Sequence, residues 1–255
     1  MKIAIVTGAS SGMGREFVHQ LEYFYRGLDE IWVVARRRER LEELKQEVRT
    51  PLRIFDGDLT KKKVYRGIEE TLTDLKPDIR MLVNGAGFGK SGRVEDLVQK
   101  ERKAQTEMVT LNCRSLTRMT LLCLPYFTKG SRIINLASAA AFCPQPGFAV
   151  YAATKAYVLS FSRSLGAEMK DRGIIVTAVC PGPVDTEFFQ TSGEVSSPLK
   201  KLTMASAPKV VHQALKDSRA GKAVSVYGIP MKAVRILTGI LPCSLILKAE
   251  ELFTK

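Results

Sequence analysis

Tyr151 and Lys155 are the residues whose types and spacing could do chemistry. Side chains at positions i and i+4 lie on one helix face, so the spacing brings a phenol and an ammonium together. A free phenol has a pKa of about 10, too high for efficient proton transfer at neutral pH. A nearby cation favours the phenolate and lowers that pKa. The pair predicts a proton donor, although chance placement of the two residues on a helix explains the spacing equally well.

A glycine-rich turn follows the first apolar run of the chain. Residues 2–6 read as a strand, and Thr7-Gly8-Ala9-Ser10-Ser11-Gly12-Met13-Gly14 leads from it into a helix. Glycines in such a turn let backbone N–H groups approach a pyrophosphate at the positive end of the helix. A glycine triplet alone is often only a tight turn. Its place after the first strand favours a dinucleotide site.

The end of the second apolar run indicates which dinucleotide binds. An NAD site usually carries an acidic residue there for the ribose 2′-hydroxyl, whereas NADP needs an arginine for the 2′-phosphate. This chain has Val34-Ala35-Arg36-Arg37, without the acid. Arg36 is the best candidate for a bidentate phosphate contact, and Arg15 adds a second positive charge. The alternative, an ordinary charged helix start, leaves the missing acid unexplained, so the sequence favours NADP.

Apolar runs alternate with helical stretches along most of the chain, which is typical of βαβ units with right-handed crossovers. The predicted strands are residues 3–6, 31–34, 52–55, 79–83, 132–136 and 174–179, and the predicted helices are residues 15–26, 38–48, 61–75, 100–127 and 152–172. The sequence shows no internal repeat and no linker long enough to separate two domains. We therefore expect one α/β domain over residues 1–255, with a doubly wound sheet.

The pattern loosens after residue 179. Residues 186–207 mix polar and apolar side chains and predict a segment that covers the substrate. A helix over 208–220 and a short strand over 222–226 follow. We expect residues 229–255 to form an apolar C-terminal extension, broken by Gly239 and Pro242.

The uncharged stretch 236–247 of this extension is too short for a membrane span, which needs about 20 residues. Three interpretations stay open: packing on the core or on a partner subunit, a wall of the substrate pocket, and a weak peripheral membrane contact. The basic residues Lys232, Arg235 and Lys248 keep the last one open.

Charge and cysteine content restrict the remaining function classes. The net charge is +13, but the basic clusters lack interleaved aromatic residues, so we expect a solvated basic face and no nucleic-acid partner. The five cysteines are scattered, odd in number and without a C-x-x-C pair, which predicts reduced thiols, a cytoplasmic location and no metal site. The first apolar run is only four residues long, and we expect no signal peptide.

Seven motifs together resemble the short-chain dehydrogenase/reductase superfamily over residues 1 to about 186. They are the turn 7–14, Asp58-Leu59, Asn84-Gly85-Ala86-Gly87, Asn112, Ser138, Tyr151 with Lys155, and Pro181-Gly182. The resemblance implies a Rossmann-like parallel sheet of about seven strands, in the order 3-2-1-4-5-6-7, with helices on both faces. It also implies hydride transfer between a nicotinamide and a carbonyl or alcohol carbon.

The resemblance assigns catalytic roles by position. Tyr151 would be the general acid in reduction, and Lys155 would lower its pKa and bind the nicotinamide ribose. Ser138 would hold the substrate oxygen, and Asn112 would position a water leading to Lys155. Taken singly, Ser138 could be a turn serine and Asn112 a helix irregularity.

The resemblance extends to the cofactor. Asp58 and Leu59 would contact the adenine, and residues 181–186 would face the nicotinamide carboxamide. The full predicted cofactor set is Gly8, Ser10, Ser11, Gly12, Met13, Gly14, Arg36, Asp58, Leu59, Asn84, Ala86, Gly87, Tyr151, Lys155, Pro181, Gly182, Val184 and Thr186. Two departures from the family stand out: Gly85 replaces a usual asparagine, and the Gly-rich C-terminal strand that helps to close many tetramers is missing.

We therefore expect an NADP(H)-dependent oxidoreductase that interconverts a ketone or aldehyde and an alcohol. Apolar residues near the site favour a hydrophobic small-molecule substrate, such as a steroid or an acyl ketone: Phe88, Phe142, Phe148, Phe188, Phe189 and Leu202. The alternative is a catalytically idle NADP-binding redox sensor, although such sensors typically lose the tyrosine or the lysine. A homodimer or homotetramer through the helices of Asn112 and Tyr151 is implied by the resemblance.

Overall fold

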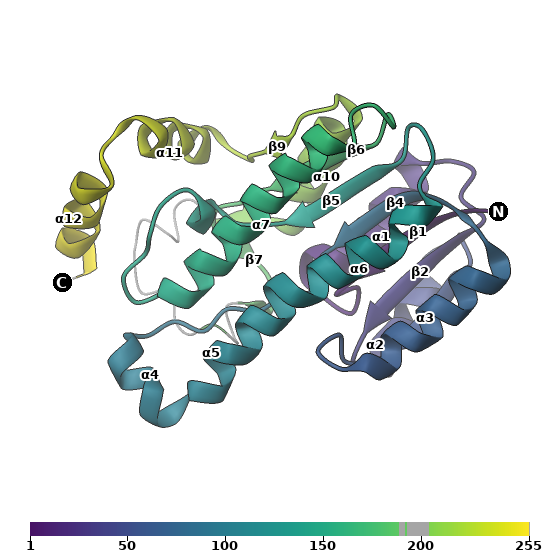
Figure 1. Cartoon of the computed structure of the whole chain (residues 1–255), viewed down its shortest axis with the longest axis horizontal. Coiled ribbons are helices and arrows are strands. Elements are labelled where there is room, and N and C mark those ends of the chain that lie inside the picture. Colours follow the sequence, from purple (N-terminus) through teal and green to yellow (C-terminus); the bar gives the residue numbers. More distant parts are fainter. Residues whose placement is uncertain (189–191, 193–203, 255) are drawn as a thin grey trace.

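The computed structural model describes residues 1–188, 192 and 204–254 (Figure 1). Phe189, Leu202 and most of the expected substrate-covering segment 186–207 lie outside the described residues.

Seven parallel strands form one sheet, in the order β3-β2-β1-β4-β5-β6-β9. The strands are β1 (Lys2–Thr7), β2 (Glu30–Ala35), β3 (Leu52–Asp56), β4 (Asp78–Asn84), β5 (Arg132–Leu136), β6 (Ile175–Val179) and β9 (Val224–Ser225). In the middle of the sheet, Val6 pairs with Val33 on one side and Val83 on the other. The predicted order is confirmed, with β9 as the seventh strand.

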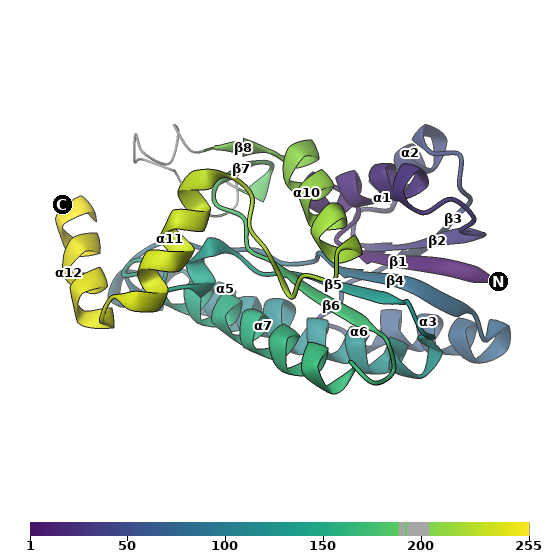
Figure 2. The same cartoon turned by 90° about the horizontal axis from the view of Figure 1, so that it is seen from above.

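Helices cover both faces of the sheet, as Figure 2 shows. One face carries α1 (Gly12–Phe24), α2 (Arg38–Glu47) and α10 (Ala207–Arg219), and the other carries α3 (Lys62–Leu75), α6 (Leu116–Cys123) and α7 (Ala149–Glu168). Because both faces are covered, the central strands carry continuous apolar runs, such as Ile3–Val6 of β1 and Ile31–Ala35 of β2, in place of strict alternation.

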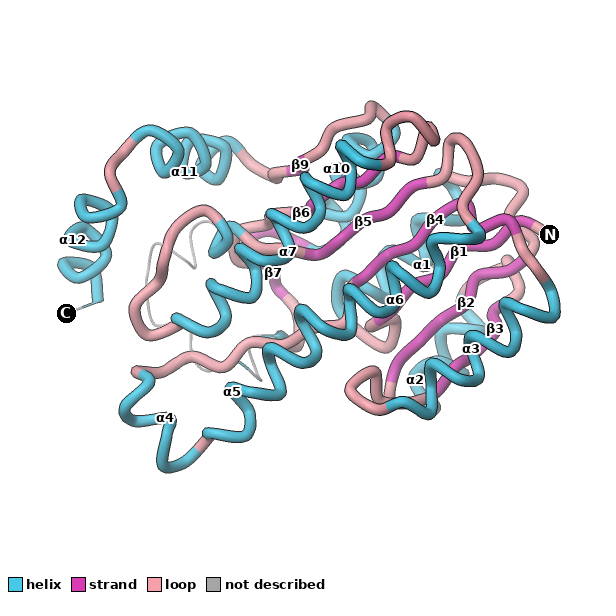
Figure 3. Tube along the Cα trace, in the orientation of Figure 1, coloured by secondary structure: helices cyan, strands magenta, loops and turns pink. Residues whose placement is uncertain are grey.

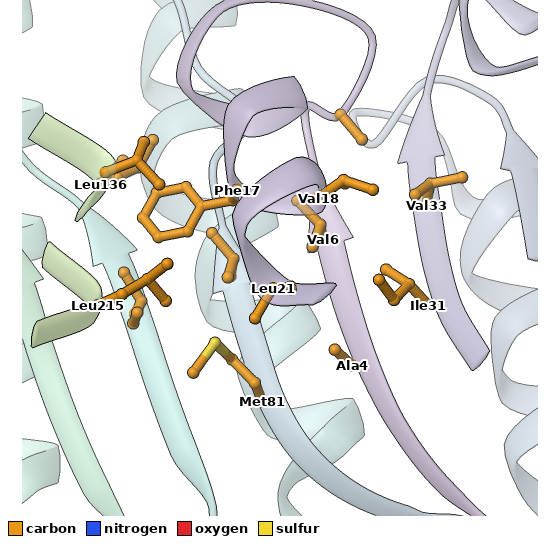
Figure 4. Close-up of a cluster of buried hydrophobic side chains, with 14 of the residues drawn as sticks. Ala4, Val6, Phe17, Val18, Leu21, Ile31, Val33, Met81, Leu136 and Leu215 are labelled. Atoms are coloured by element: carbon orange, nitrogen blue, oxygen red, sulfur yellow. The ribbon is translucent and has the colours of Figure 1, made fainter. Parts of the chain in front are cut away.

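Successive residues of β1 supply the two cores, since side chains alternate across a strand. Ala4 and Val6 belong to the core beneath α1, where they pack with Phe17 and Leu21 (Figure 4). Ile3 and Ile5 belong to the core on the opposite face. The first strand is thus held from both sides, which fixes the turn at its end.

The prediction of one helix over residues 100–127 is wrong in detail. Helix α4 (Val94–Lys100) comes first, and α5 (Arg102–Val109) starts after a break at Glu101. A π-helical turn, η1 (Thr110–Ser115), then joins α5 to α6, and η2 (Leu124–Tyr126) ends the path with Pro125 in its first turn. Figure 3 shows α5 to α6 as one continuous helical path. A small separate pair, β7 (Val184–Asp185) with β8 (Ala205–Ser206), was not expected either.

The C-terminal extension forms α11 (Ile229–Ile240) and α12 (Cys243–Thr254), which project past β9 (Figures 1 and 2). The break falls at Pro242, whereas Gly239 lies within α11 and does not interrupt it. No residue of α11 is buried. One face of α11 nonetheless touches the body, because Met231 lies where a Cβ on Gly182 would stand. Among the described residues, no helix is long and apolar enough to cross a membrane.

Candidate active site

A cavity of about 460 Å³ opens beyond the carboxyl ends of the central strands. This is where doubly wound sheets bind their ligands. The lining includes twelve of the predicted cofactor residues: Gly8, Ser10, Ser11, Gly12, Met13, Gly14, Arg36, Asp58, Leu59, Ala86, Gly87 and Thr186.

The glycine turn leaves its backbone open toward this cavity. Gly8 has φ +72°, and a Cβ there would lie 2.8 Å from the backbone of Gly85 and Ala86. A Cβ on Gly14 would overlap the Gly8 carbonyl oxygen. Ser11, the N-cap of α1, makes no side-chain capping hydrogen bond, and the first turn holds no acidic residue. The N–H groups at this helix start are therefore available to a pyrophosphate, and the residues present fit a dinucleotide.

Two arginines after β2 line the mouth of the cavity. Arg36 is exposed and has no hydrogen-bond or ion-pair partner in the described part of the chain. The neighbouring Arg37 donates from Nη2 to the Ser10 hydroxyl at 3.2 Å and pairs with Glu187 at 2.9 Å. Arg15 instead pairs with Glu47 and does not line the cavity. The positive charge at the mouth thus comes from residues 36 and 37.

Tyr151 lies in the first turn of α7, buried between two aromatic rings. Its ring stacks on Phe148 with centroids 4.3 Å apart, and the Phe188 centroid lies 5.5 Å away. Lys155, one turn later, is buried as well and donates from Nζ to the carbonyl of Leu136 at 2.7 Å. Its Nζ is 5.6 Å from the centre of the tyrosine ring.

Ser138 joins this pair from the end of β5. Its hydroxyl accepts a hydrogen bond from the Ala140 N–H at 3.2 Å and caps the short helix η3 (Ala139–Ala141). The same side chain lies close enough to Tyr151 to lower the pKa of the phenol. Ser138 is therefore both a turn serine and a neighbour of the phenol.

Asn112 lies in the π-helical turn, a kind of irregularity frequent at functional sites. Its amide donates to the Phe88 carbonyl at 2.9 Å and to the Thr154 hydroxyl at 3.1 Å, and its Oδ1 accepts from the Phe88 N–H at 3.1 Å. A Cβ on Gly87 would lie 2.9 Å from that Oδ1 and 3.6 Å from Lys155 Nζ. The turn thus places Asn112 beside the lysine; its water-binding role stays a prediction.

Comparison with known proteins gives this constellation its family. A family model described as short chain dehydrogenase matches residues 2–196. The chain is 34% identical over 216 residues to an uncharacterised oxidoreductase of Staphylococcus epidermidis, covering 84% of this chain and 90% of the relative. It is 33% identical over 194 residues to very-long-chain 3-oxoacyl-CoA reductase-B of Danio rerio, covering 73% of this chain and 61% of the relative. A short-chain dehydrogenase from Sphingobium yanoikuyae, solved with NADPH, has a TM-score of 0.75 and 27% identity, covering 95% of this chain and 97% of that one.

The chain belongs to the short-chain dehydrogenase/reductase family. It is thus an oxidoreductase with a Rossmann-like nucleotide-binding fold and a nicotinamide cofactor, of a family that acts on alcohol and carbonyl groups.

The pKa values in this short-chain dehydrogenase depart from the sequence-based expectation. Burial raises the pKa of Tyr151 to about 12, although the polar side chain of Ser138 acts in the opposite direction. Burial also lowers the pKa of Lys155 to about 8. Lysine was expected to make the phenol more acidic, but desolvation of both groups is the larger effect.

Four predicted cofactor residues besides the catalytic pair do not line the cavity: Asn84, Pro181, Gly182 and Val184. The Asn84 amide is buried and donates to the Thr120 hydroxyl and to Asn135 Oδ1, linking β4 to α6 and β5. The Pro181 carbonyl accepts from the Ala139 N–H at 2.8 Å, next to Ser138. These residues support the site from behind, and their cofactor contacts stay predictions.

Arg37 and Glu187 are among the lining residues that were not predicted from the sequence. Arg37 stood in the quoted motif, but nothing in the sequence says which of two adjacent arginines turns toward the glycine turn. Glu187 follows the predicted Thr186 directly, yet its partner Arg37 lies 150 positions away in sequence.

The lowered pKa of Lys155 predicts a pH-dependent stability. Its pKa is about 8 in the fold and about 10.4 when unfolded, so between these values the unfolded chain binds more protons and the folded state gains stability as pH rises. Relative to a Lys155→Met variant, the wild type should gain about 2 kcal/mol of unfolding free energy between pH 7.5 and 9.5. Urea unfolding followed by circular dichroism measures this. If the difference in unfolding free energy between the wild type and Lys155→Met does not change with pH, the lowered pKa of Lys155 is contradicted. The control is Lys129→Met, which removes a surface lysine.

Proposed function

We propose that this chain is an NADP(H)-dependent reductase that interconverts a ketone or aldehyde and an alcohol. The observation that carries the proposal is the convergence of Ser138, Tyr151 and Lys155 beside a cavity whose mouth carries two arginines and no acid at the end of β2. The arginines favour a 2′-phosphate. The scattered cysteines support a cytoplasmic location.

The bound cofactor supplies hydride to the carbonyl carbon in reduction and accepts it in oxidation. Tyr151 gives its proton to the oxygen of the same carbonyl, so one hydride and one proton make the alcohol. Ser138 donates a hydrogen bond to that oxygen and holds it beside the phenol. Lys155, mostly protonated at pH 7, stabilises the phenolate that remains.

The raised pKa of Tyr151 suits the reductive direction. An alkoxide is a much stronger base than a phenolate, so a phenol with a pKa of about 12 still protonates it. In the oxidative direction the phenol must first lose its proton, which burial opposes. A cofactor-binding sensor needs no such acid, and the presence of all four catalytic residue types favours the enzyme over the idle alternative.

A hydrophobic substrate fits the surroundings of the phenol. Phe88, Phe148 and Phe188 pack around Tyr151 with Met108 in one apolar cluster. Such walls favour a bulky apolar ketone, such as a steroid or an acyl ketone. The names of relatives, including a 17-beta-hydroxysteroid dehydrogenase type 3 of Mus musculus, support the same substrate class.

Tyr151→Phe should lower carbonyl reduction at least about a hundredfold, because it removes the proton donor and keeps the stacked ring. NADPH binding, measured by fluorescence titration, should stay near normal. Tyr23→Phe on α1 is the control, since Tyr23 is 79% exposed and lies outside the cavity lining. Intact turnover in the Tyr151 variant would refute the assigned acid.

We also propose that the chain forms a dimer through α6 and α7. An open groove of about 770 Å³ runs between α3, α6 and α7. Leu121 and Tyr157 line it with 58% and 42% of their surfaces exposed. Exposed apolar side chains on neighbouring helices are typical of subunit interfaces.

Leu121→Glu should shift the chain toward the monomer in analytical ultracentrifugation, because it places a charge within this face. Val98→Glu, a similar change at an exposed valine of α4, should leave the assembly unchanged. Equal behaviour of the two variants would contradict an interface on α6 and α7.

The outward face of α11 supports a proposed peripheral contact with anionic membranes. Ile229, Ile236 and Ile240 stand at i, i+7 and i+11, on one face, and each is more than half exposed. Lys232 and Arg235 flank this stripe, and no acidic residue occurs between positions 229 and 248. An apolar stripe bordered by cations complements lipid with anionic headgroups.

The chain should sediment with phosphatidylcholine vesicles that contain phosphatidylglycerol and less with vesicles that lack it, with weaker binding at high salt. Changing both Ile236 and Ile240 to Glu should abolish sedimentation with the anionic vesicles, while Val94→Glu on α4 should leave it unchanged. Sedimentation that survives the double change would contradict the contact. A changed oligomeric state would instead assign the stripe to a second copy.

A further inference from the structure

A carboxylate from a distant segment bridges Arg37, which lines the cavity, and Arg40, which lies just outside the lining. Glu187 Oε2 is 2.9 Å from Arg37 Nη1, and Glu187 Oε1 is 3.0 Å from Arg40 Nη1. Arg37 also donates to the Ser10 hydroxyl of the glycine turn. The carboxylate, the guanidiniums and the turn therefore form one polar cluster beside the place expected for the adenosine ribose.

A carboxylate that bridges two guanidiniums uses the same N–H donors that a phosphate would use. Glu187 directly follows Thr186, and both residues line the cavity. The pairs are only partly buried, with 37% to 41% of each side chain exposed, so each contributes little to stability and is readily exchanged. The arrangement resembles a site held by an internal anion until an external one arrives.

We propose that Glu187 is a specificity-determining residue whose carboxylate competes with the cofactor 2′-phosphate for Arg37 and Arg40. The inference rests on the proposed use of NADP. A 2′-phosphate that extends from Arg36 to Arg37 and Arg40 replaces the carboxylate on the latter two arginines, whereas a ligand without the phosphate leaves both ion pairs in place. Glu187 thus weakens binding of the phosphorylated ligand selectively and moderates the preference that the arginines create.

The chain offers a matched control two residues away. Asp185 lies in β7 on the same segment, is exposed, and does not line the cavity. Asp185→Asn removes the same charge as Glu187→Gln without touching Arg37 or Arg40. If net charge alone matters, both substitutions change the nucleotide affinity alike. If the carboxylate competes at the arginines, only Glu187→Gln changes it.

Two nucleotides that differ only in the 2′-phosphate isolate the effect without turnover. Adenosine 2′,5′-bisphosphate and adenosine 5′-monophosphate are titrated calorimetrically into the full chain and both variants. Glu187→Gln should bind the bisphosphate on the order of fivefold tighter and the monophosphate unchanged, the size expected when partly exposed ion pairs no longer compete. Asp185→Asn should match the wild type. In an Arg37→Gln background, Glu187→Gln should increase the affinity for the bisphosphate by a smaller factor.

Three results would overturn the proposed competition. The bisphosphate binds the wild type better than the monophosphate, but Glu187→Gln changes neither; then NADP preference stands and Glu187 has no part in it. Alternatively, both variants tighten binding equally, and the effect is one of net charge. If the wild type and Glu187→Gln bind the two nucleotides alike, the proposed NADP preference fails together with the inference.

Discussion

The buried hydrogen bond from Lys155 to the Leu136 carbonyl is the contact on which the active site depends. An ammonium out of water is costly unless its donors are satisfied, so this bond fixes the lysine and, with it, α7 against the end of β5. Ser138 lies two residues beyond that carbonyl, and Tyr151 one turn before the lysine. A single polar contact thus helps to set the distance between the Tyr151 phenol and the Ser138 hydroxyl, the two groups proposed to share a substrate oxygen.

The same burial explains why lysine and tyrosine do not act as their spacing suggests. Each group loses hydration, and its pKa shifts in the direction that favours its neutral form. The pKa of the phenol rises, and the pKa of the amine falls. The phenol therefore keeps its proton until a strong base forms beside it. Desolvation of this kind suits the proposed proton donor. The rings of Phe148 and Phe188 that pack against Tyr151 are also the proposed apolar wall for a substrate.

Features with a local cause could be predicted from the sequence. The alternation of strands and helices follows from the apolar runs, whereas the strand order was implied by the family resemblance. The glycine turn needs a backbone that only glycine allows at Gly8 and Gly14. Helix α4 was missed, because residues 94–100 are mostly polar and exposed. The π-helical turn was missed because the helical pattern runs through it. What brings Glu187 to Arg37 is a contact across 150 residues, which no local pattern contains.

The two ends of the site differ in chemistry because different layers of the fold build them. The cofactor end consists of backbone groups and arginines after β1 and β2, where helix starts meet the sheet edge and charge stays partly in water. The catalytic end lies between α7 and the loop after β4, where Gly87 lets Asn112 and Lys155 come close. Met231 of α11 closes in on Gly182 from the far side, so the helix with the exposed apolar stripe also borders the nicotinamide-facing turn expected of the family.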